Sequence, residues 1–160
     1  NFGKCFATED LVLSTVLLLN GPNLNLLGKR EPHLYGEVTL KEIESNFKKS
    51  AVASGLVAEC IQSNSESTLI ESIHAASSKG TEAIVINPGA YGHTSVGLRD
   101  AFLGTGLPFV EVHLSNVFAR EEFRSRSLLS DIAIGLISGF GEKSYDLGLQ
   151  AILTYLQKNK

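Results

Sequence analysis

Residues 16–36 read VLLLNGPNLNLLGKREPHLYG, an apolar run followed by a long polar segment. The first four residues are continuously apolar, which is typical of a buried strand. The segment that follows starts with Asn and Gly-Pro and carries Arg30 and Tyr35 near its end. Connections of this length are uncommon in compact domains and usually serve function, although a solvated surface excursion is the alternative. The stretch therefore predicts a first strand followed by a functional loop.

A helix is predicted to follow this loop. Thr39 and Glu42 have the spacing of a capping box, in which each residue satisfies a backbone N–H of the other. Apolar residues then recur at helical spacing over 40–54. Gly55 is expected at the C-terminal cap, where glycine adopts positive φ without strain.

The remainder of the chain alternates between short apolar runs and segments of helical periodicity. The expected strands are 15–19, 57–62, 83–87, 108–113 and 132–138, and the expected helices are 40–54, 68–78, 94–104 and 145–157. Such alternation predicts an α/β fold, a single-domain, doubly wound, five-stranded parallel sheet with helices on both faces. The flavodoxin-like strand order 2-1-3-4-5 is expected by analogy.

Length and charge limit the function classes. The chain has 160 residues and 17.2 kDa, which suits one domain, assigned to residues 15–160 after a disordered extension over residues 1–14. The net charge of −3 and the pI of about 5.8 argue against a nucleic-acid partner, which favours a basic surface.

The N-terminal apolar run does not resemble a targeting or membrane segment. Residues 11–19 are too few to span a bilayer, and Glu9 and Asp10 stand where a signal peptide carries positive charge. Cys5 and Cys60 lack the spacing of metal ligands and are expected to be free thiols in a reducing compartment. We therefore expect a cytoplasmic protein that does not bind membranes.

Polar side chains gather where the predicted strands end. In open parallel sheets, ligands bind beyond the carboxyl ends of the strands. The residues expected there are Asn20, Asn23, Asn87, His93, Glu111, His113, Ser115, Asn116, Arg120, Arg124 and Arg126. Each alone has a structural explanation, since Asn commonly forms turns and His often serves as a hydrogen-bonded structural residue. Glu111 and His113 are two apart on one strand and share a face, which favours a carboxylate holding an imidazole.

Several chemistries are disfavoured by missing motifs. The segment after the first strand lacks the Lys-Ser/Thr of a phosphate-binding loop, and the glycines at 139–141 lack dinucleotide spacing. A nucleophile elbow and a metal-ligand cluster are also missing from the sequence. The pattern that remains favours general acid–base chemistry by Tyr and His, without cofactor or metal, on a small polar, anionic ligand.

Ten motifs together resemble the type II 3-dehydroquinate dehydratases. They run in the order of that family over residues 16–155 and comprise Asn20-Gly-Pro-Asn-Leu-Asn-Leu-Leu-Gly, Arg30-Glu-Pro, Tyr35-Gly36, Gln62-Ser-Asn, Ile73-His74, Ile86-Asn-Pro-Gly-Ala-Tyr, His93-Thr-Ser, Leu98-Arg-Asp, Glu111-Val-His-Leu-Ser-Asn and Arg120-Glu-Glu-Phe-Arg124. The resemblance implies a flavodoxin-like fold and an anti elimination of water from 3-dehydroquinate through an enolate, in the shikimate pathway or in quinate breakdown.

The resemblance also implies catalytic roles for five residues. Tyr35 would remove the C2 proton, and Arg30 would favour its phenolate, since a nearby cation favours the charged form. Asn23 would hold a water against the enolate oxygen. His113 would protonate the departing C1 hydroxyl, and Glu111 would orient His113.

The resemblance implies a substrate-binding set and an assembly as well. Leu114 and Ser115 would bind the carboxylate, while Asn87, His93 and Arg124 would bind the ring hydroxyls. Asp100 would lie near that site from its own or a neighbouring subunit. The loop 28–35 would form a mobile lid, no cofactor would be needed, and trimers would group into a dodecamer.

The sequence departs from the family pattern at four positions, Gly92, Ser125, Ser144 and Ser67, none of which supplies a chemical group of the mechanism. Gly92 bears on the placement of His93, and Ser125 bears on subunit contacts. Two other hypotheses stay open. A flavin- or nucleotide-binding module of the same fold would show in the visible absorbance spectrum. A catalytically weakened homologue would fail an ultraviolet assay for the conjugated enone product.

Overall fold

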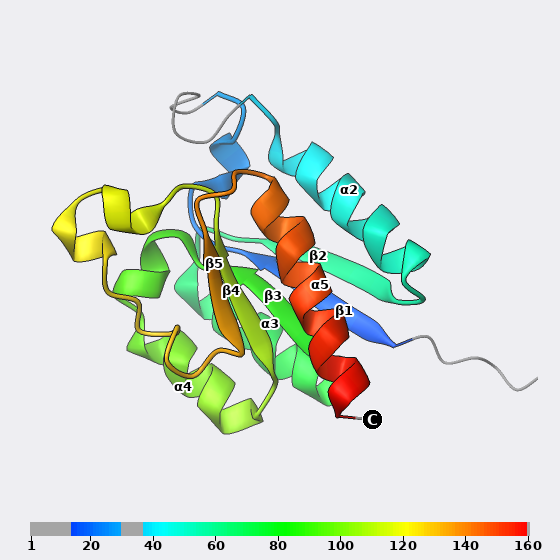
Figure 1. The fold of residues 1–160 in the computed structure, drawn as a ribbon. Coiled ribbons are helices and arrows are strands. Elements are labelled where there is room, and N and C mark those ends of the chain that lie inside the picture. Colours follow the sequence, from blue (N-terminus) through cyan, green and yellow to red (C-terminus); the bar gives the residue numbers. More distant parts are fainter. Residues whose placement is uncertain (1–13, 30–36, 160) are drawn as a thin grey trace, which may run out of the picture.

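A five-stranded parallel sheet forms the centre of the molecule (Figure 1). The computed structural model describes residues 14–29 and 37–159. The strands are β1 (Thr15–Asn20), β2 (Val57–Gln62), β3 (Ala83–Asn87), β4 (Phe109–His113) and β5 (Gly135–Ser138). They pair in the order β2-β1-β3-β4-β5, so the predicted fold class and strand order are confirmed.

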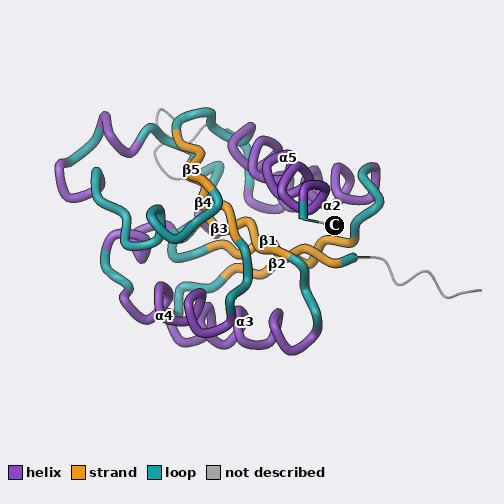
Figure 2. Tube along the Cα trace, turned by 60° about the horizontal axis from the view of Figure 1, so that its bottom comes forward, coloured by secondary structure: helices purple, strands orange, loops and turns teal. Residues whose placement is uncertain are grey.

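Helices cover both faces of this sheet. They are α2 (Leu40–Ala53), α3 (Glu66–Lys79), α4 (Val96–Thr105) and α5 (Lys143–Lys158). Figure 2 shows α2 and α5 on one side of the strands and α3 and α4 on the other. Neighbouring strand residues point to opposite faces, so Leu18 joins the core under α2 and α5, whereas Leu17 joins the core over α3 and α4. The continuous apolar runs of β1 and β3 follow from this double coverage.

Short 3-10 helices occupy three of the connections at the carboxyl end of the sheet. They are η1 (Leu24–Leu26), η2 (Gly89–His93), η3 (Val117–Ala119) and η4 (Glu122–Arg124). The sequence predicted only loops in these segments. The single turns shape the rim on which the candidate site lies.

The start of α2 confirms the predicted capping box. The Thr39 backbone N–H donates to a Glu42 carboxylate oxygen at 2.8 Å, and the Glu42 backbone N–H donates to the Thr39 hydroxyl at 3.3 Å. The Thr39 hydroxyl also donates to a Glu42 carboxylate oxygen at 2.6 Å, and this bond, followed by the Thr39 N–H bond, lowers the pKa of Glu42. The predicted C-terminal cap was one residue off, because Ser54 is the cap and Gly55 follows it with φ of +78°.

The predicted strand 132–138 was too long. The strand begins only at Gly135, because the backbone N–H groups of Ile132 and Ala133 both donate to Leu129 and close a turn. Pairing with β4 starts when the Ile134 N–H donates to Phe109. The other predicted bounds agree with the structure to within two residues.

The proposed N-terminal extension lies outside the described residues, apart from Ser14, and so does Cys5. Cys60 is a free thiol on β2, half-buried, and burial raises its pKa to about 12. Among the described residues, no helix has both the length and the apolar character needed to cross a membrane.

Candidate active site

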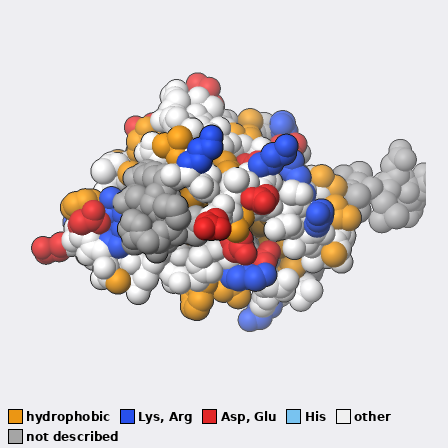
Figure 3. Space-filling model, turned by 90° about the horizontal axis from the view of Figure 1, so that it is seen from above, with side chains coloured by type: hydrophobic (Ala, Val, Ile, Leu, Met, Phe, Trp, Pro, Cys, Tyr) orange, Lys and Arg blue, Asp and Glu red, His pale blue; other side chains and the backbone are white. Residues whose placement is uncertain are grey.

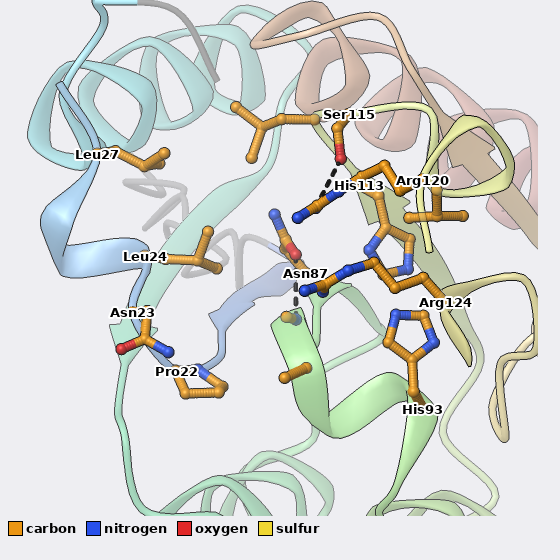
Figure 4. A pocket seen from close by; sticks show the side chains of 14 residues that line it. Pro22, Asn23, Leu24, Leu27, Asn87, His93, His113, Ser115, Arg120 and Arg124 are labelled. Atoms are coloured by element: carbon orange, nitrogen blue, oxygen red, sulfur yellow. Dashed lines mark hydrogen bonds between the residues drawn. The ribbon is translucent and has the colours of Figure 1, made fainter. Parts of the chain in front are cut away.

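A pocket opens where the carboxyl ends of β1, β3 and β4 meet, at the end of the molecule that is uppermost in Figure 1. Its wall combines polar groups from three loops with apolar residues of η1 (Figure 4). The lining residues are Pro22, Asn23, Leu24, Leu27, Asn87, Gly89, Ala90, His93, His113, Leu114, Ser115, Val117, Arg120 and Arg124. Figure 3 looks onto this end, where acidic and basic side chains both lie at the surface. The described lining itself carries imidazoles, amides, a hydroxyl and two guanidiniums and no carboxylate, so it suits a small ligand with several oxygen atoms.

His113 and Glu111 form a buried pair at the end of β4. The imidazole Nε2 lies 2.6 Å from a Glu111 carboxylate oxygen, and Glu111 is 0% exposed. The carboxylate accepts only, so Nε2 carries a proton and the tautomer is set. No described residue bonds the other ring nitrogen, Nδ1, which leaves this atom for a ligand. The predicted contact between a carboxylate and an imidazole is confirmed.

Ser127 completes the environment of Glu111. Its hydroxyl lies 2.9 and 2.8 Å from the two carboxylate oxygens, and Ser127 also accepts the backbone N–H of Leu129 at 3.0 Å. A buried carboxylate costs free energy unless its oxygens are satisfied. Ser127 therefore keeps Glu111 stable behind His113.

The substitution Ser127→Ala is expected to lower the free energy of unfolding by about 1.5–3 kcal/mol, since it removes a hydrogen bond to a buried charged group. Urea denaturation at fixed protein concentration measures the change. Ser78→Ala is the matched control, because the Ser78 hydroxyl bonds only a helix carbonyl at the surface. Equal stability of the two variants would show that Glu111 does not depend on Ser127.

His93 lies beside His113. The two rings are stacked with centroids 6.0 Å apart and an interplanar angle of 15°. His93 Nδ1 lies 2.8 Å from the Arg126 carbonyl oxygen, so Nδ1 is the protonated nitrogen and Nε2 remains for a ligand. Two imidazoles thus present one nitrogen each, from the end of η2 and the end of β4.

Two arginines bring positive charge to the same wall, as Figure 4 shows. Arg120 donates to the Ser115 hydroxyl at 3.3 Å. Arg124 donates to Glu121 at 2.7 Å, and the Arg124 guanidinium lowers the pKa of this exposed carboxyl after the larger effect of a backbone hydrogen bond. Guanidinium groups beside hydroxyl and imidazole groups favour a ligand with a carboxylate.

A buried chain of hydrogen bonds orients Asn87 at the floor of the pocket. Its Oδ1 accepts the Gly89 backbone N–H at 3.2 Å, and its Nδ2 donates to the Tyr145 hydroxyl at 2.9 Å. Tyr145 in turn donates to Asn20 Oδ1 at 2.9 Å. Burial raises the pKa of Tyr145, so this phenol stays neutral and acts as a link between two amides rather than as a base.

The comparisons with known proteins agree with this geometry. The sequence profile of the family described as dehydroquinase class II matches residues 14–153. The chain belongs to the class II dehydroquinases. A 3-dehydroquinate dehydratase from Prochlorococcus marinus is 58% identical over 144 residues, which cover 90% of this chain and 96% of that protein. Membership of this family makes the chain a hydro-lyase and confirms the resemblance seen in the sequence.

Two solved structures of type II dehydroquinases are similar to the whole fold. The enzyme from Butyrivibrio crossotus DSM 2876 superposes with a TM-score of 0.85 at 39% identity, and the match covers 88% of this chain and 97% of that one. The enzyme from Propionibacterium acnes gives a TM-score of 0.84 at 40% identity with the same coverage.

Most residues that the dehydroquinase resemblance predicted lie together in the structure. Seven of them line the pocket: Asn23, Asn87, His93, His113, Leu114, Ser115 and Arg124. Glu111 lies behind His113. Asp100 is exposed on α4 and does not line the pocket of its own chain, so a position near the site from a neighbouring subunit stays a prediction. Arg30 and Tyr35 lie outside the described residues.

Sequence reasoning missed two contributors to this pocket: Ser127, which supports Glu111, and Tyr145, which holds Asn87. Arg120 and Asn20 were expected at this end of the sheet, and Arg120 lines the wall while Asn20 accepts from Tyr145. Ser127 had no signal of its own in the sequence, because it lies in a polar loop 16 residues after Glu111. No sequence signal pointed to Tyr145, since it lies 125 residues from its partner Asn20.

Gly92, one of the departures from the family pattern, lies directly beside the Glu111–His113 pair. A Cβ there would come within 2.8 Å of the Pro88 ring and 3.5 Å of a Glu111 carboxylate oxygen. The Gly92 carbonyl accepts the Leu128 N–H at 2.8 Å, which ties the His93 loop to the Ser127 loop. The backbone at 92 is thus held by that bond.

The described residues of the site form no metal-binding cluster. In the described part of the chain, no three His, Cys, Asp or Glu side chains cluster as metal ligands would.

Proposed function

We propose that this chain catalyses the dehydration of 3-dehydroquinate to 3-dehydroshikimate by an anti elimination through an enolate. The observation that carries the proposal is the Glu111–His113 pair in the wall of a polar pocket, in a chain that belongs to the class II dehydroquinases. Such an enzyme works in the cytoplasm, in the shikimate pathway or in quinate breakdown.

His113 is the proposed general acid. Hydroxide is a poor leaving group, and an imidazolium can protonate it near neutral pH. Glu111 binds Nε2–H, so Nδ1–H is the donor to the departing C1 hydroxyl. The buried carboxylate neutralises the charge that the ring carries before this transfer.

Tyr35 is the proposed general base, and Arg30 is its partner. Both lie outside the described residues, and their roles rest on the family motif. A proton next to a ketone needs a base stronger than a carboxylate, and a tyrosinate stabilised by a guanidinium meets that need. The electron pair of the broken C–H bond moves to the ketone oxygen, where Asn23 would hold a water that stabilises the enolate.

The remaining groups suit the oxygen atoms of the substrate. Leu114 and Ser115 would bind the carboxylate through backbone N–H groups and the Ser115 hydroxyl, next to the Arg120 guanidinium. Ring hydroxyls would be bound by Asn87, His93 and Arg124, with Asp100 supplied by a neighbouring subunit. None of these interactions uses a cofactor or a metal.

The proposal is tested by incubating the purified chain with 3-dehydroquinate and following ultraviolet absorbance. The expected result is the steady appearance of the conjugated enone carboxylate at a rate proportional to protein concentration. A folded chain that leaves the substrate unchanged would contradict the proposal and favour a weakened homologue. A visible spectrum of the same sample addresses the flavin alternative.

A closed homo-oligomer built of trimers, and completed as a dodecamer, is the proposed assembly. Three phenylalanines around the pocket loops are more than half exposed: Phe118 (61%), Phe123 (65%) and Phe140 (63%). Exposed apolar side chains in one region are typical of a protein interface. Light scattering is expected to report a mass of several chains, and a single 17.2 kDa species would contradict the prediction.

A further inference from the structure

Asn23 has an unusual backbone conformation. Its φ is +66° and its ψ −1°, and no other non-glycine residue in the ranges 14–29 and 37–159 has positive φ. A side chain in this region costs free energy, although Asn tolerates it better than most residues. Such a conformation persists only where the surroundings impose it.

The side chain of Asn64, in the loop that follows β2, contacts Asn23 in this conformation. The Asn23 backbone N–H donates to Asn64 Oδ1 at 2.9 Å. The same oxygen accepts Gln62 Nε2 at 3.1 Å, and Gln62 Nε2 also lies 3.2 Å from the Gly21 carbonyl oxygen. Two donors on one oxygen fix which way the Asn64 amide faces.

The backbone of Asn64 is anchored separately. Its carbonyl oxygen accepts the Tyr91 hydroxyl at 2.7 Å, so Asn64 joins the loops that follow β1, β2 and β3. In contrast, no described residue accepts a hydrogen bond from Asn64 Nδ2. Every hydrogen bond that this side chain makes within the described ranges therefore uses its oxygen.

The opposite side of the Asn23 turn is closed by backbone. The Gly21 N–H donates to the Asn87 carbonyl at 2.8 Å, and a Cβ at position 21 would lie 2.3 Å from the Pro88 carbonyl oxygen. The β1 loop is thus packed against the β3 loop on this side. On the other side, the Ser63 N–H donates to the Asn20 carbonyl oxygen, Gln62 lies at the Gly21 carbonyl oxygen, and Asn64 accepts from Asn23. Of these contacts, the one from Asn64 is made to Asn23 itself.

We propose that Asn64 is a positioning residue that acts through Asn23. Its side-chain oxygen keeps the Asn23 backbone in the left-handed conformation, and that conformation places the Asn23 side chain in the pocket wall seen in Figure 4. Gln62 orients the Asn64 amide for this contact. The inference rests on the proposed function, in which Asn23 holds the water at the enolate oxygen.

The first test compares Asn64→Leu with Asn64→Asp. Leucine has a similar size but no acceptor, whereas aspartate keeps an acceptor oxygen, replaces the Nδ2 group by a second carboxylate oxygen and adds a negative charge. Misplacement of a catalytic group by about 1 Å can cost up to about 10²-fold in rate, so we expect kcat to fall about 10–100-fold in Asn64→Leu. Asn64→Asp is expected to restore most of this loss, and Asn46→Leu on the exposed surface of α2 serves as the control.

A double-mutant cycle separates positioning from a merely structural role. Asn23→Gly removes the side chain and tolerates positive φ. If Asn64 acts through Asn23, Asn64→Leu causes no further loss of kcat in the Asn23→Gly background. A full additional loss in that background, or wild-type kcat in the single variant Asn64→Leu, would overturn the inference.

A measurement that does not depend on turnover, the hydrogen exchange of the Asn23 amide, tests this inference separately from the proposed function. Hydrogen exchange of the Asn23 amide proton is expected to be at least about tenfold faster in Asn64→Leu than in Asn64→Asp, because the leucine variant lacks the acceptor that protects it. Equal exchange rates would refute the contact. A wild-type chain that leaves 3-dehydroquinate unchanged but shows this difference would refute the proposed function alone.

Discussion

The substitution His113→Ala is expected to lower kcat about 10²–10⁴-fold, the usual contribution of one general acid. The residue lines the pocket, and Glu111 at 2.6 Å holds its Nε2. Without the imidazole, the C1 hydroxyl would have to leave unprotonated. Steady-state kinetics at saturating substrate measures the effect, and circular dichroism checks that the variant is folded.

His74→Ala is the matched control for this experiment. His74 is exposed on α3, away from the pocket, and its loss is expected to leave kcat unchanged. Wild-type kcat in His113→Ala would remove His113 from the mechanism, whatever the fate of the other assignments.

The substitution Tyr35→Phe is expected to abolish turnover while 3-dehydroquinate still binds. The loss is at least as large as for His113, because no other described group can replace a phenolate base. Tyr145, the tyrosine nearest to the pocket floor, is buried, and its raised pKa keeps it neutral. Isothermal titration with the inactive variant measures binding, and Tyr155→Phe on α5 is the control. Residual turnover above about 1% of wild type would point to another base.

The pH dependence of Arg30→Ala tests how Tyr35 is activated. An unperturbed tyrosine has a pKa of about 10, so little phenolate exists at neutral pH without a nearby cation. Removal of Arg30 should raise the pKa of Tyr35 and leave the variant nearly inactive at neutral pH. Activity should then return as the pH rises and the phenol ionises. A uniformly low profile would instead mean that Arg30 only fixes the loop.

The fold could be predicted from local patterns in the sequence. Continuous apolar runs marked β1 and β3, since strands covered on both faces need apolar residues at every position. Capping residues marked the helix starts, as Thr39 shows. The end of the sheet on which the pocket lies followed from topology alone, because ligands in parallel sheets bind beyond the carboxyl ends of the strands.

The supporting contacts could not be predicted from such patterns. Asn64 lies 41 residues from Asn23, and Tyr145 lies 125 residues from Asn20, so no periodicity links them. The late start of the fifth strand has a similar cause, since the apolar residues Ile132 and Ala133 lie in a turn that packs on the core.

One measurement tests the central claim most directly. The wild-type chain is incubated with 3-dehydroquinate that carries a single deuterium at C2, on the side anti to the C1 hydroxyl, and the product is analysed by mass spectrometry. If the pocket catalyses an anti elimination with a base and His113 on opposite faces of the ring, 3-dehydroshikimate forms without the deuterium. Product that retains the deuterium, or unchanged substrate, would contradict the account.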